Sequence, residues 1–152
     1  KGAGVSHDPP ERPQPPPSRP PGGVAGSGFV ARKGTVTVLG KAFPKEVAYA
    51  EELAAKGYDV VVRGKAAAGA DFIINGVRWE YKQLEAATIN AVRQNIREGL
   101  KQAPRVIIDG REAGLTHADA IRAVTAQANA GRMGTAEEVR VLTTTGEYVW
   151  RP

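Results

Sequence analysis

The chain contains no cysteine, only two histidines and no long apolar run, and each absence removes a class of function. Without cysteine, neither a disulfide framework nor a thiolate metal site is possible. His7 lies in a proline-rich segment, so His117 is the one histidine of the remaining chain, and a ribonuclease mechanism that needs two histidines is excluded. Because no stretch of about 18 apolar residues and no signal-like opening occurs, we expect no stable membrane insertion.

Prolines are concentrated near the beginning of the chain. Eight of the eleven prolines lie between Pro9 and Pro21, and a glycine-rich run follows through Gly28. Such a composition predicts an extended, solvated linker that adds nothing to a core, because large apolar residues are scarce in it. We therefore expect a disordered linker over residues 1–28, one domain over residues 29–152, and a longer polypeptide from which both derive.

The net charge of +5 is a weak argument for a nucleic-acid partner, because the charge is unevenly distributed. Residues 1–40 carry a net charge of +3, which leaves only +2 for the rest of the chain. A nucleic-acid hypothesis must therefore depend on the local arrangement of residues rather than on bulk charge.

An Asn-Gly pair, Asn75 and Gly76, lies between two alternating runs that are rich in β-forming residues. This is the strongest short signal for a β-hairpin, since both residues readily adopt the positive φ angles of a type I′ turn. Counting outward from the turn predicts that Asp71 faces Glu80 and that Lys82 lies on the same face one step further along. The opposite face is predicted to be core and carries Phe72, Ile74, Val77, Trp79 and Tyr81.

The facing carboxylates of Asp71 and Glu80 require a compensating charge. Like charges directly opposed on neighbouring strands are destabilising, and two unit charges about 4 Å apart repel by roughly 4 kcal/mol at an effective dielectric of about 20. A hard divalent cation offsets this repulsion, and Mg²⁺ is typically held by one or two carboxylates together with substrate phosphate oxygens. The hairpin therefore predicts a metal site, with Mg²⁺ as the expected ion and Mn²⁺ or Zn²⁺ as alternatives.

The other elements follow from apolar periodicity, caps and breakers. The central order is αβββαβ, in which the second helix can serve as a right-handed crossover to a parallel strand. The sequence thus predicts an α/β (α+β) fold, with a mixed sheet flanked by helices. The expected elements are a strand over 35–39, a helix over 44–56, a strand over 58–63, the hairpin over 71–84, a helix from 88 to 103, a strand over 105–109, a helix from 116 to 131, and a closing hairpin over 138–150.

This order, with an acidic residue opening the second strand and Glu-x-Lys in the third, resembles the restriction-endonuclease-like PD-(D/E)XK nuclease superfamily. The motif stands here as Asp71 followed by Glu80-Tyr81-Lys82, with Ala70 at the position of the proline. A longer resemblance, over residues 44–150, is to the C-terminal tRNase toxin domains of contact-dependent growth inhibition and related bacterial polymorphic toxins. The segments that carry it are Glu46-Val47-Ala48, Leu53-Ala54, Gly57-Tyr58-Asp59-Val60, the runs from Ala70 to Gly76 and from Trp79 to Lys82, Lys101-Gln102-Ala103 and Val106-Ile107-Ile108-Asp109.

The resemblance implies a metal-dependent endoribonuclease that cleaves tRNA. Such an effector is secreted or delivered from the cell surface as part of a larger polypeptide, acts in the cytoplasm of a competing bacterium and is neutralised by a cognate immunity protein. By the same resemblance, Asp71 and Glu80 bind the divalent cation, and Lys82 orients or activates the attacking water and helps to neutralise the phosphate.

Two further sets of charged residues are candidates for the site. Superfamily members often add a glutamate from the first helix, and Glu46 and Glu51 both qualify, with Glu51 closer to the predicted apolar stripe. On the second helix, Arg93, Arg97 and Lys101 form an i, i+4 row that can contact phosphates and so position a nucleic acid. The same row is also what an ordinary solvated basic face would look like.

Other interpretations of the motif stay open. Asp71 could cap the preceding glycine-rich loop, while Arg78, Glu80 and Lys82 form a solvated strand face with ordinary ion pairs. A DNase of the same fold would use the same motif. Outside enzymology, a binding module of a secreted protein could hold a structural cation at the acidic pair.

A barnase-like ribonuclease is the remaining enzymatic alternative. It would need no metal ion, and its activity would therefore survive chelation. Its candidate residues are Lys82, Arg151 and one of Thr143, Thr144 and Thr145.

Overall fold

The computed structural model describes residues 32–65 and 70–152, so the predicted linker lies outside the described residues. It has an α+β fold whose seven strands follow one another in the order β1-β2-β3-β4-β5-β6-β7. The described residues form two compact units, one ending at Trp79 and the other beginning at Glu80. This boundary falls within β4 (Val77–Gln83), and each unit is described by itself.

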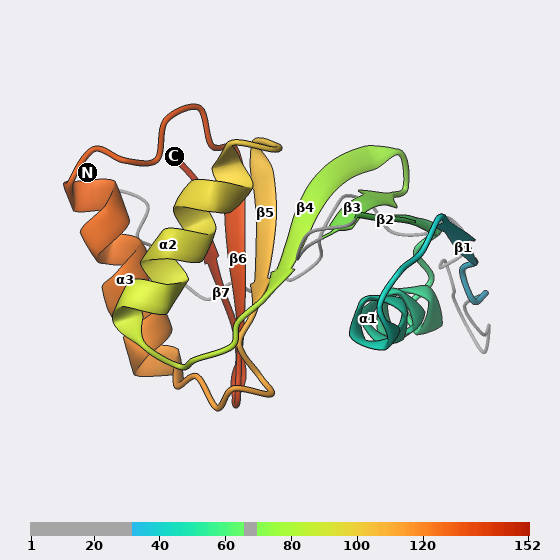
Figure 1. The fold of residues 1–152 in the computed structure, drawn as a ribbon, viewed down its shortest axis with the longest axis horizontal. Coiled ribbons are helices and arrows are strands. Elements are labelled where there is room, and N and C mark those ends of the chain that lie inside the picture. Colours follow the sequence, from blue (N-terminus) through green and yellow to red (C-terminus); the bar gives the residue numbers. More distant parts are fainter. Residues whose placement is uncertain (1–31, 66–69) are drawn as a thin grey trace, which may run out of the picture. The chain divides into compact units, whose positions relative to one another are not determined.

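The first unit contains β1 (Val36–Leu39), α1 (Pro44–Ala55), β2 (Val60–Gly64) and β3 (Ala70–Ile74). Strand β1 pairs parallel with β2, and β2 pairs antiparallel with β3. Helix α1 provides the connection between β1 and β2 that parallel pairing requires, and it lies alongside them (Figure 1).

Local sequence explains why α1 begins and ends where it does. Pro44 occupies the first turn, where its missing N–H costs nothing. The backbone N–H of Phe43 donates to Glu46 Oε1 at 2.9 Å, and Gly57 adopts a φ of 102° just beyond the last turn. The helix buries Tyr49 against Phe72 of β3, with ring centroids 5.9 Å apart. Helix α1 therefore covers the face of β3 that the sequence predicts to be core.

The turn at the hairpin has the predicted backbone conformation. Asn75 has a φ of 48° and Gly76 a φ of 85°, as a type I′ turn requires. Asn75 also binds the segment before β2, since its Oδ1 accepts from the backbone N–H of Asp59 at 2.8 Å. Of the predicted core positions, Phe72, Ile74, Trp79 and Tyr81 are buried, whereas Val77 beside the turn is half-buried.

The second unit contains the end of β4, α2 (Ile89–Leu100), β5 (Arg105–Asp109), α3 (His117–Asn129), β6 (Glu138–Thr143) and β7 (Gly146–Trp150). Strands β4, β5 and β6 pair parallel in succession, whereas β6 and β7 form an antiparallel hairpin. The predicted crossover is thus confirmed, because α2 connects β4 to the parallel strand β5.

Helices α2 and α3 lie side by side over one face of this unit (Figure 1). Each begins at a threonine whose hydroxyl caps it: Thr88 accepts from Ala91 N–H and Thr116 from Asp119 N–H. Their apolar sides close over alternate residues of the strands. The buried cluster consists of Leu84, Val92, Ile96, Val106, Ile108, Leu115, Ala120, Ala123, Val124, Met133, Ala136, Val139, Val141, Tyr148 and Trp150.

No helix in the described part of the chain is long and apolar enough to cross a membrane.

Candidate functional site

Asp71, the first acid of the predicted motif, lies in β3 directly opposite Arg63 of β2. The residue is only 5% exposed, yet three cations approach its carboxylate. Arg78 Nη2 donates to Oδ1 at 3.0 Å, Lys65 Nζ lies 3.4 Å from the same oxygen, and Arg63 Nη1 lies 3.6 Å from Oδ2. Asp71 is therefore a buried carboxylate held among positive charges.

These cations decide the protonation state of Asp71. Burial alone would raise the pKa of this carboxyl group, but the hydrogen bond from Arg78 and the charges of Lys65 and Arg78 lower the pKa below its ordinary value. The group therefore stays ionised at neutral pH. An ionised carboxylate is what both a metal ligand and an ion-pair partner require.

Of the two glutamates proposed from α1, the structure buries Glu46 and exposes Glu51. The expectation that Glu51 lies closer to the apolar stripe is therefore wrong. Glu46 occupies the first turn, where its side chain folds back to cap Phe43 and so becomes enclosed. Burial raises the pKa of Glu46, against the opposing effects of the Phe43 hydrogen bond and the charge of Lys65. Lys65 thus influences both Asp71 and Glu46.

Glu80 and Lys82 lie on β4 in the second unit, in register with Val106 and Ile108 of β5. Residues in register on neighbouring strands point to the same face, so both charged side chains lie on the face that α2 and α3 cover. Glu80 is only 1% exposed, whereas Lys82 is half-buried. The prediction that Glu80 and Lys82 share one face of β4 is therefore consistent with the pairing of β4 with β5.

The predicted apposition of Asp71 and Glu80 stays a prediction, because the two residues belong to different units. The solvated-face alternative is wrong for Glu80, since this residue is buried. It is right about one detail, the ion pair between Arg78 and Asp71.

The basic row on α2 separates into two kinds of residue. Arg93 Nε donates to Gln127 Oε1 of α3 at 2.8 Å, so Arg93 joins the two helices. Arg97 is exposed, and Lys101 pairs with Glu98 at 3.6 Å while its side chain remains largely exposed. Only Arg97 and Lys101 thus offer an accessible positive charge to a ligand.

Two residues of the metal-free alternative, Thr143 and Arg151, make structural contacts. Thr143 is buried, and its hydroxyl donates to Gly146 O at 2.9 Å within the β6–β7 turn. Arg151 Nε lies 3.3 Å from Glu138 Oε1. His117 follows the cap Thr116, and its Nδ1 lies 3.3 Å from Thr143 Oγ1.

A divalent cation would depend on the carboxylates of the motif. No cluster of three or more histidine, aspartate or glutamate residues suited to a metal ion occurs within residues 32–65 and 70–152. Mg²⁺ does not need such a cluster, because one or two carboxylates suffice when phosphate oxygens complete the coordination. The carboxylates of Asp71 and Glu80 are oxygen donors of the kind that a hard cation takes.

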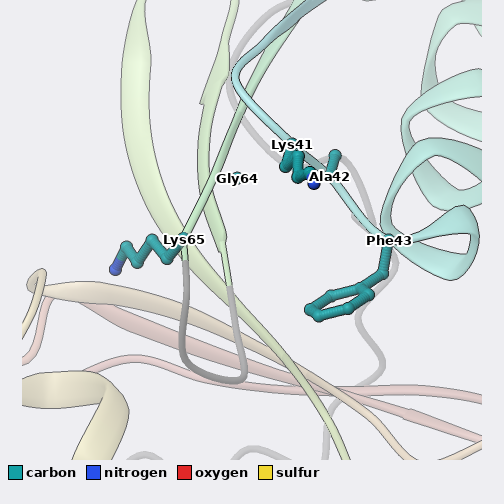
Figure 2. A pocket seen from close by; sticks show the side chains of 5 residues that line it. All are labelled: Lys41, Ala42, Phe43, Gly64 and Lys65. Atoms are coloured by element: carbon teal, nitrogen blue, oxygen red, sulfur yellow. The ribbon is translucent and has the colours of Figure 1, made fainter.

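The sequence reasoning missed two residues beside Asp71. Arg63 and Lys65 reach Asp71 only because β2 pairs antiparallel with β3, a register that no turn signal indicates. Lys65 also lines a pocket with Lys41, Ala42, Phe43 and Gly64 (Figure 2).

Comparisons with known proteins give one sequence match and one structural match. Residues 69–147, slightly more than half of the chain, match the family described as the contact-dependent growth inhibition CdiA C-terminal domain. The fold is similar to that of the CdiA-CT/CdiI toxin and immunity complex from Burkholderia pseudomallei, with a TM-score of 0.53 over 78% of this chain and 100% of that chain, at 18% identity. That identity supports likeness of fold alone. No curated protein matches the chain.

Proposed function

Because the chain belongs to the CdiA C-terminal domain family of contact-dependent growth inhibition toxins, we propose that it is a metal-dependent endoribonuclease that cleaves tRNA. In this proposal the domain is delivered by a larger secreted polypeptide, acts in the cytoplasm of a competing bacterium and is blocked by a cognate immunity protein. A toxin-immunity complex of similar fold supports the partner.

The observation that carries the enzymatic part is the burial of both motif acids. Asp71 is 5% exposed and Glu80 is 1% exposed. Aspartate and glutamate are almost never fully buried unless they are paired, and buried acids with perturbed pKa values concentrate at functional sites. The pKa of Asp71 is lowered despite its burial, so the carboxylate stays negatively charged, as a metal ligand must be.

Asp71 and Glu80 would hold the divalent cation together. The register predicted from the Asn75-Gly76 turn supports this, because it places the two residues opposite each other. Glu46 is the candidate third acid, since it is the buried glutamate of α1. When bound, the cation supplies Lewis-acid stabilisation of the phosphate oxygens and a more acidic water.

Lys82 and the arginines around Asp71 would handle the charges of the reaction. In hydrolysis the water oxygen bonds to phosphorus, the bond from phosphorus to the leaving ribose oxygen breaks, and that oxygen takes up a proton. The Lys82 ammonium would orient the water and offset the charge that grows on the phosphate. Arg63, Lys65 and Arg78 would attract the polyanionic substrate towards Asp71, while Arg97 and Lys101 would contact more distant phosphates.

The test is cleavage of total tRNA and of duplex DNA by the purified chain, with Mg²⁺, Mn²⁺, Zn²⁺ or EDTA. We expect tRNA cleavage that requires a divalent cation and falls by about 100-fold or more in Asp71→Ala, Glu80→Gln and Lys82→Ala, the range typical of losing a group that handles protons or charge. Glu51→Gln and Lys56→Ala, changes of exposed residues with the same charges, serve as matched controls.

Folded motif variants that cut at the wild-type rate would overturn the proposal. Cleavage that persists in EDTA would instead favour the metal-free alternative, and cleavage of DNA alone would identify a DNase of the same fold.

A further inference from the structure

The function proposed above assigns no ligand to the pocket beside the first turn of α1, although it uses Lys65, one of the residues that line this pocket. It has a volume of about 640 Å³ and is lined by Lys41, Ala42, Phe43, Gly64 and Lys65. Pockets of about 300 to 1,000 Å³ are the size that accommodates small molecules or single groups of a larger ligand. Figure 2 shows the Phe43 ring projecting from the start of α1, with Gly64 at the end of β2 and Lys65 just beyond it.

The backbone around this pocket is held in place by direct contact. A Cβ on Gly64 would lie 1.8 Å from the carbonyl oxygen of Lys41, so only glycine allows this segment to rest on the end of β2. Phe43 is fixed at its backbone, because its N–H donates to Glu46 Oε1 and its carbonyl accepts from the N–H of Glu46 and of Val47. The backbone from which the Phe43 side chain projects is thus held in place by the fold.

The lining combines an aromatic surface with positive charge. Phe43 is 53% exposed despite its size, and Lys41 is exposed beside it. Lys65 on the other side has its Nζ 3.4 Å from Asp71 Oδ1. Lys65, one of the lining residues, therefore also contacts the carboxylate that begins the proposed catalytic motif.

We propose that this pocket binds one nucleotide of a single-stranded segment of the RNA substrate, with the base stacked on Phe43 and the phosphate near Lys41 and Lys65. Proteins recognise unpaired RNA by stacking its splayed bases on aromatic side chains, and a positively charged surface follows the backbone. An apolar protein partner would not need the two lysines. The inference rests on the proposed function, because it names the part of the substrate that this site holds.

The experiment measures the Kd of the full chain for a short fluorescein-labelled single-stranded RNA in EDTA, so that metal-dependent hydrolysis does not interfere. Phe43→Ala is expected to weaken binding about tenfold, within the range for removing one stacking contact. Phe43→Trp should bind at least as tightly as the wild type, whereas Phe43→Leu, which is apolar but has no π-face, should resemble Phe43→Ala. Leu39→Ala is the matched control, since Leu39 is an exposed apolar residue that does not line the pocket.

Three results would overturn the inference: no measurable RNA binding by the wild-type chain, equal Kd values for Phe43→Ala and Leu39→Ala, or full affinity in Phe43→Leu. Equal Kd values for Phe43→Ala and Leu39→Ala would mean that Phe43 does not bind RNA, and would favour a protein partner as the ligand of the pocket. Unfolding curves of each variant show whether a loss of affinity reflects a loss of fold.

The proposed function can fail independently. If wild-type chain cuts no RNA but Phe43 still controls the Kd, the nucleotide site survives and the nuclease assignment does not. If tRNA is cut but substitution of Phe43 has no effect on the Kd, the nuclease assignment survives and the nucleotide site does not.

Discussion

Two buried acids of the first unit, Asp71 and Glu46, show how neighbouring charges set the pKa of a carboxyl group. Both are almost fully enclosed, and burial taken alone acts to raise the pKa of each carboxyl group. Arg78 and Lys65 outweigh burial and lower the pKa of Asp71, whereas the hydrogen bond from Phe43 and the charge of Lys65 do not outweigh it at Glu46. The two groups therefore have opposite tendencies, Asp71 to hold a charge and Glu46 to hold a proton.

The raised pKa of Glu46 predicts a pH-dependent cost to stability. In the folded state Glu46 binds its proton more tightly than in the unfolded chain, so stability falls as pH rises above the ordinary glutamate pKa and through the folded-state pKa. Glu46→Gln removes this ionisation and keeps an oxygen that can accept from Phe43 N–H. We expect its melting temperature at pH 7 to rise by roughly 2–4 °C, and to match that of the wild type at pH 4.

Glu51→Gln is the control, because Glu51 lies on the same helix and is exposed. Thermal unfolding followed by circular dichroism at both pH values measures the difference. A destabilised Glu46→Gln at pH 7 would mean that the negative charge of Glu46 supports the fold. Slower tRNA cleavage together with higher stability is the result expected if Glu46 also serves the reaction.

At the scale of helices and strands, the sequence predicted most of the element types and boundaries that short local signals determine. Strand β5 has the predicted bounds, and α2 and α3 begin one residue after the predicted starts at 88 and 116, because caps, prolines and apolar periodicity act within a few residues. Contacts between elements were not predictable in this way. The bond from Arg93 to Gln127 and the approach of Arg63 and Lys65 to Asp71 depend on packing between segments that are distant in sequence or on an unknown register.

The packing of α2 on β5 depends on Gly99. Alanine usually stabilises a helix relative to glycine by about 1 kcal/mol, but a Cβ on Gly99 would lie 2.8 Å from Val106 Cγ1. Such overpacking typically costs about 1–3 kcal/mol, so Gly99→Ala should be destabilising. The double variant Gly99→Ala, Val106→Ala should be less destabilised than the sum of the two single variants by about 1 kcal/mol.

Urea unfolding of the two single variants and the double variant measures this coupling. Gly146→Ala is the control, because a Cβ there would meet nothing within 4 Å and little change is expected. Additive effects of Gly99→Ala and Val106→Ala would show that the helix shifts rather than presses on the strand.

At the scale of the whole molecule, the family match and the fold divide the proposed site into two parts. The matched region, residues 69–147, contains Asp71, Glu80 and Lys82. Glu46 and every residue that lines the pocket lie before it. The sequence could indicate the motif, because its spacing around one turn is local, but not the pocket, which forms only where the segment before α1 rests on Gly64. In our proposals, the matched region carries the chemistry and the preceding elements help to select the substrate.

This division predicts how the chain tolerates truncation. Removal of residues 1–28, the predicted linker, should leave the melting temperature and the rate of tRNA cleavage within experimental error of the full chain. Removal of residues 1–59 deletes β1 and α1 and exposes Val60, Val62 and Phe72, which are buried in the full chain. Each such side chain is worth about 1.5–3 kcal/mol when buried, so this variant should not fold.

Expression of each form in a bacterial host extends the measurement to toxicity. The form that lacks residues 1–28 should arrest growth as the full chain does, and the same form carrying Lys82→Ala should not. Arrest by the form that lacks residues 1–59 would contradict the requirement for α1, and with it the assignment of Glu46 and the pocket to the site. Harmless expression of a stable, folded form that lacks only residues 1–28 would instead place a necessary part of the toxin in the segment that the sequence predicts to be a linker.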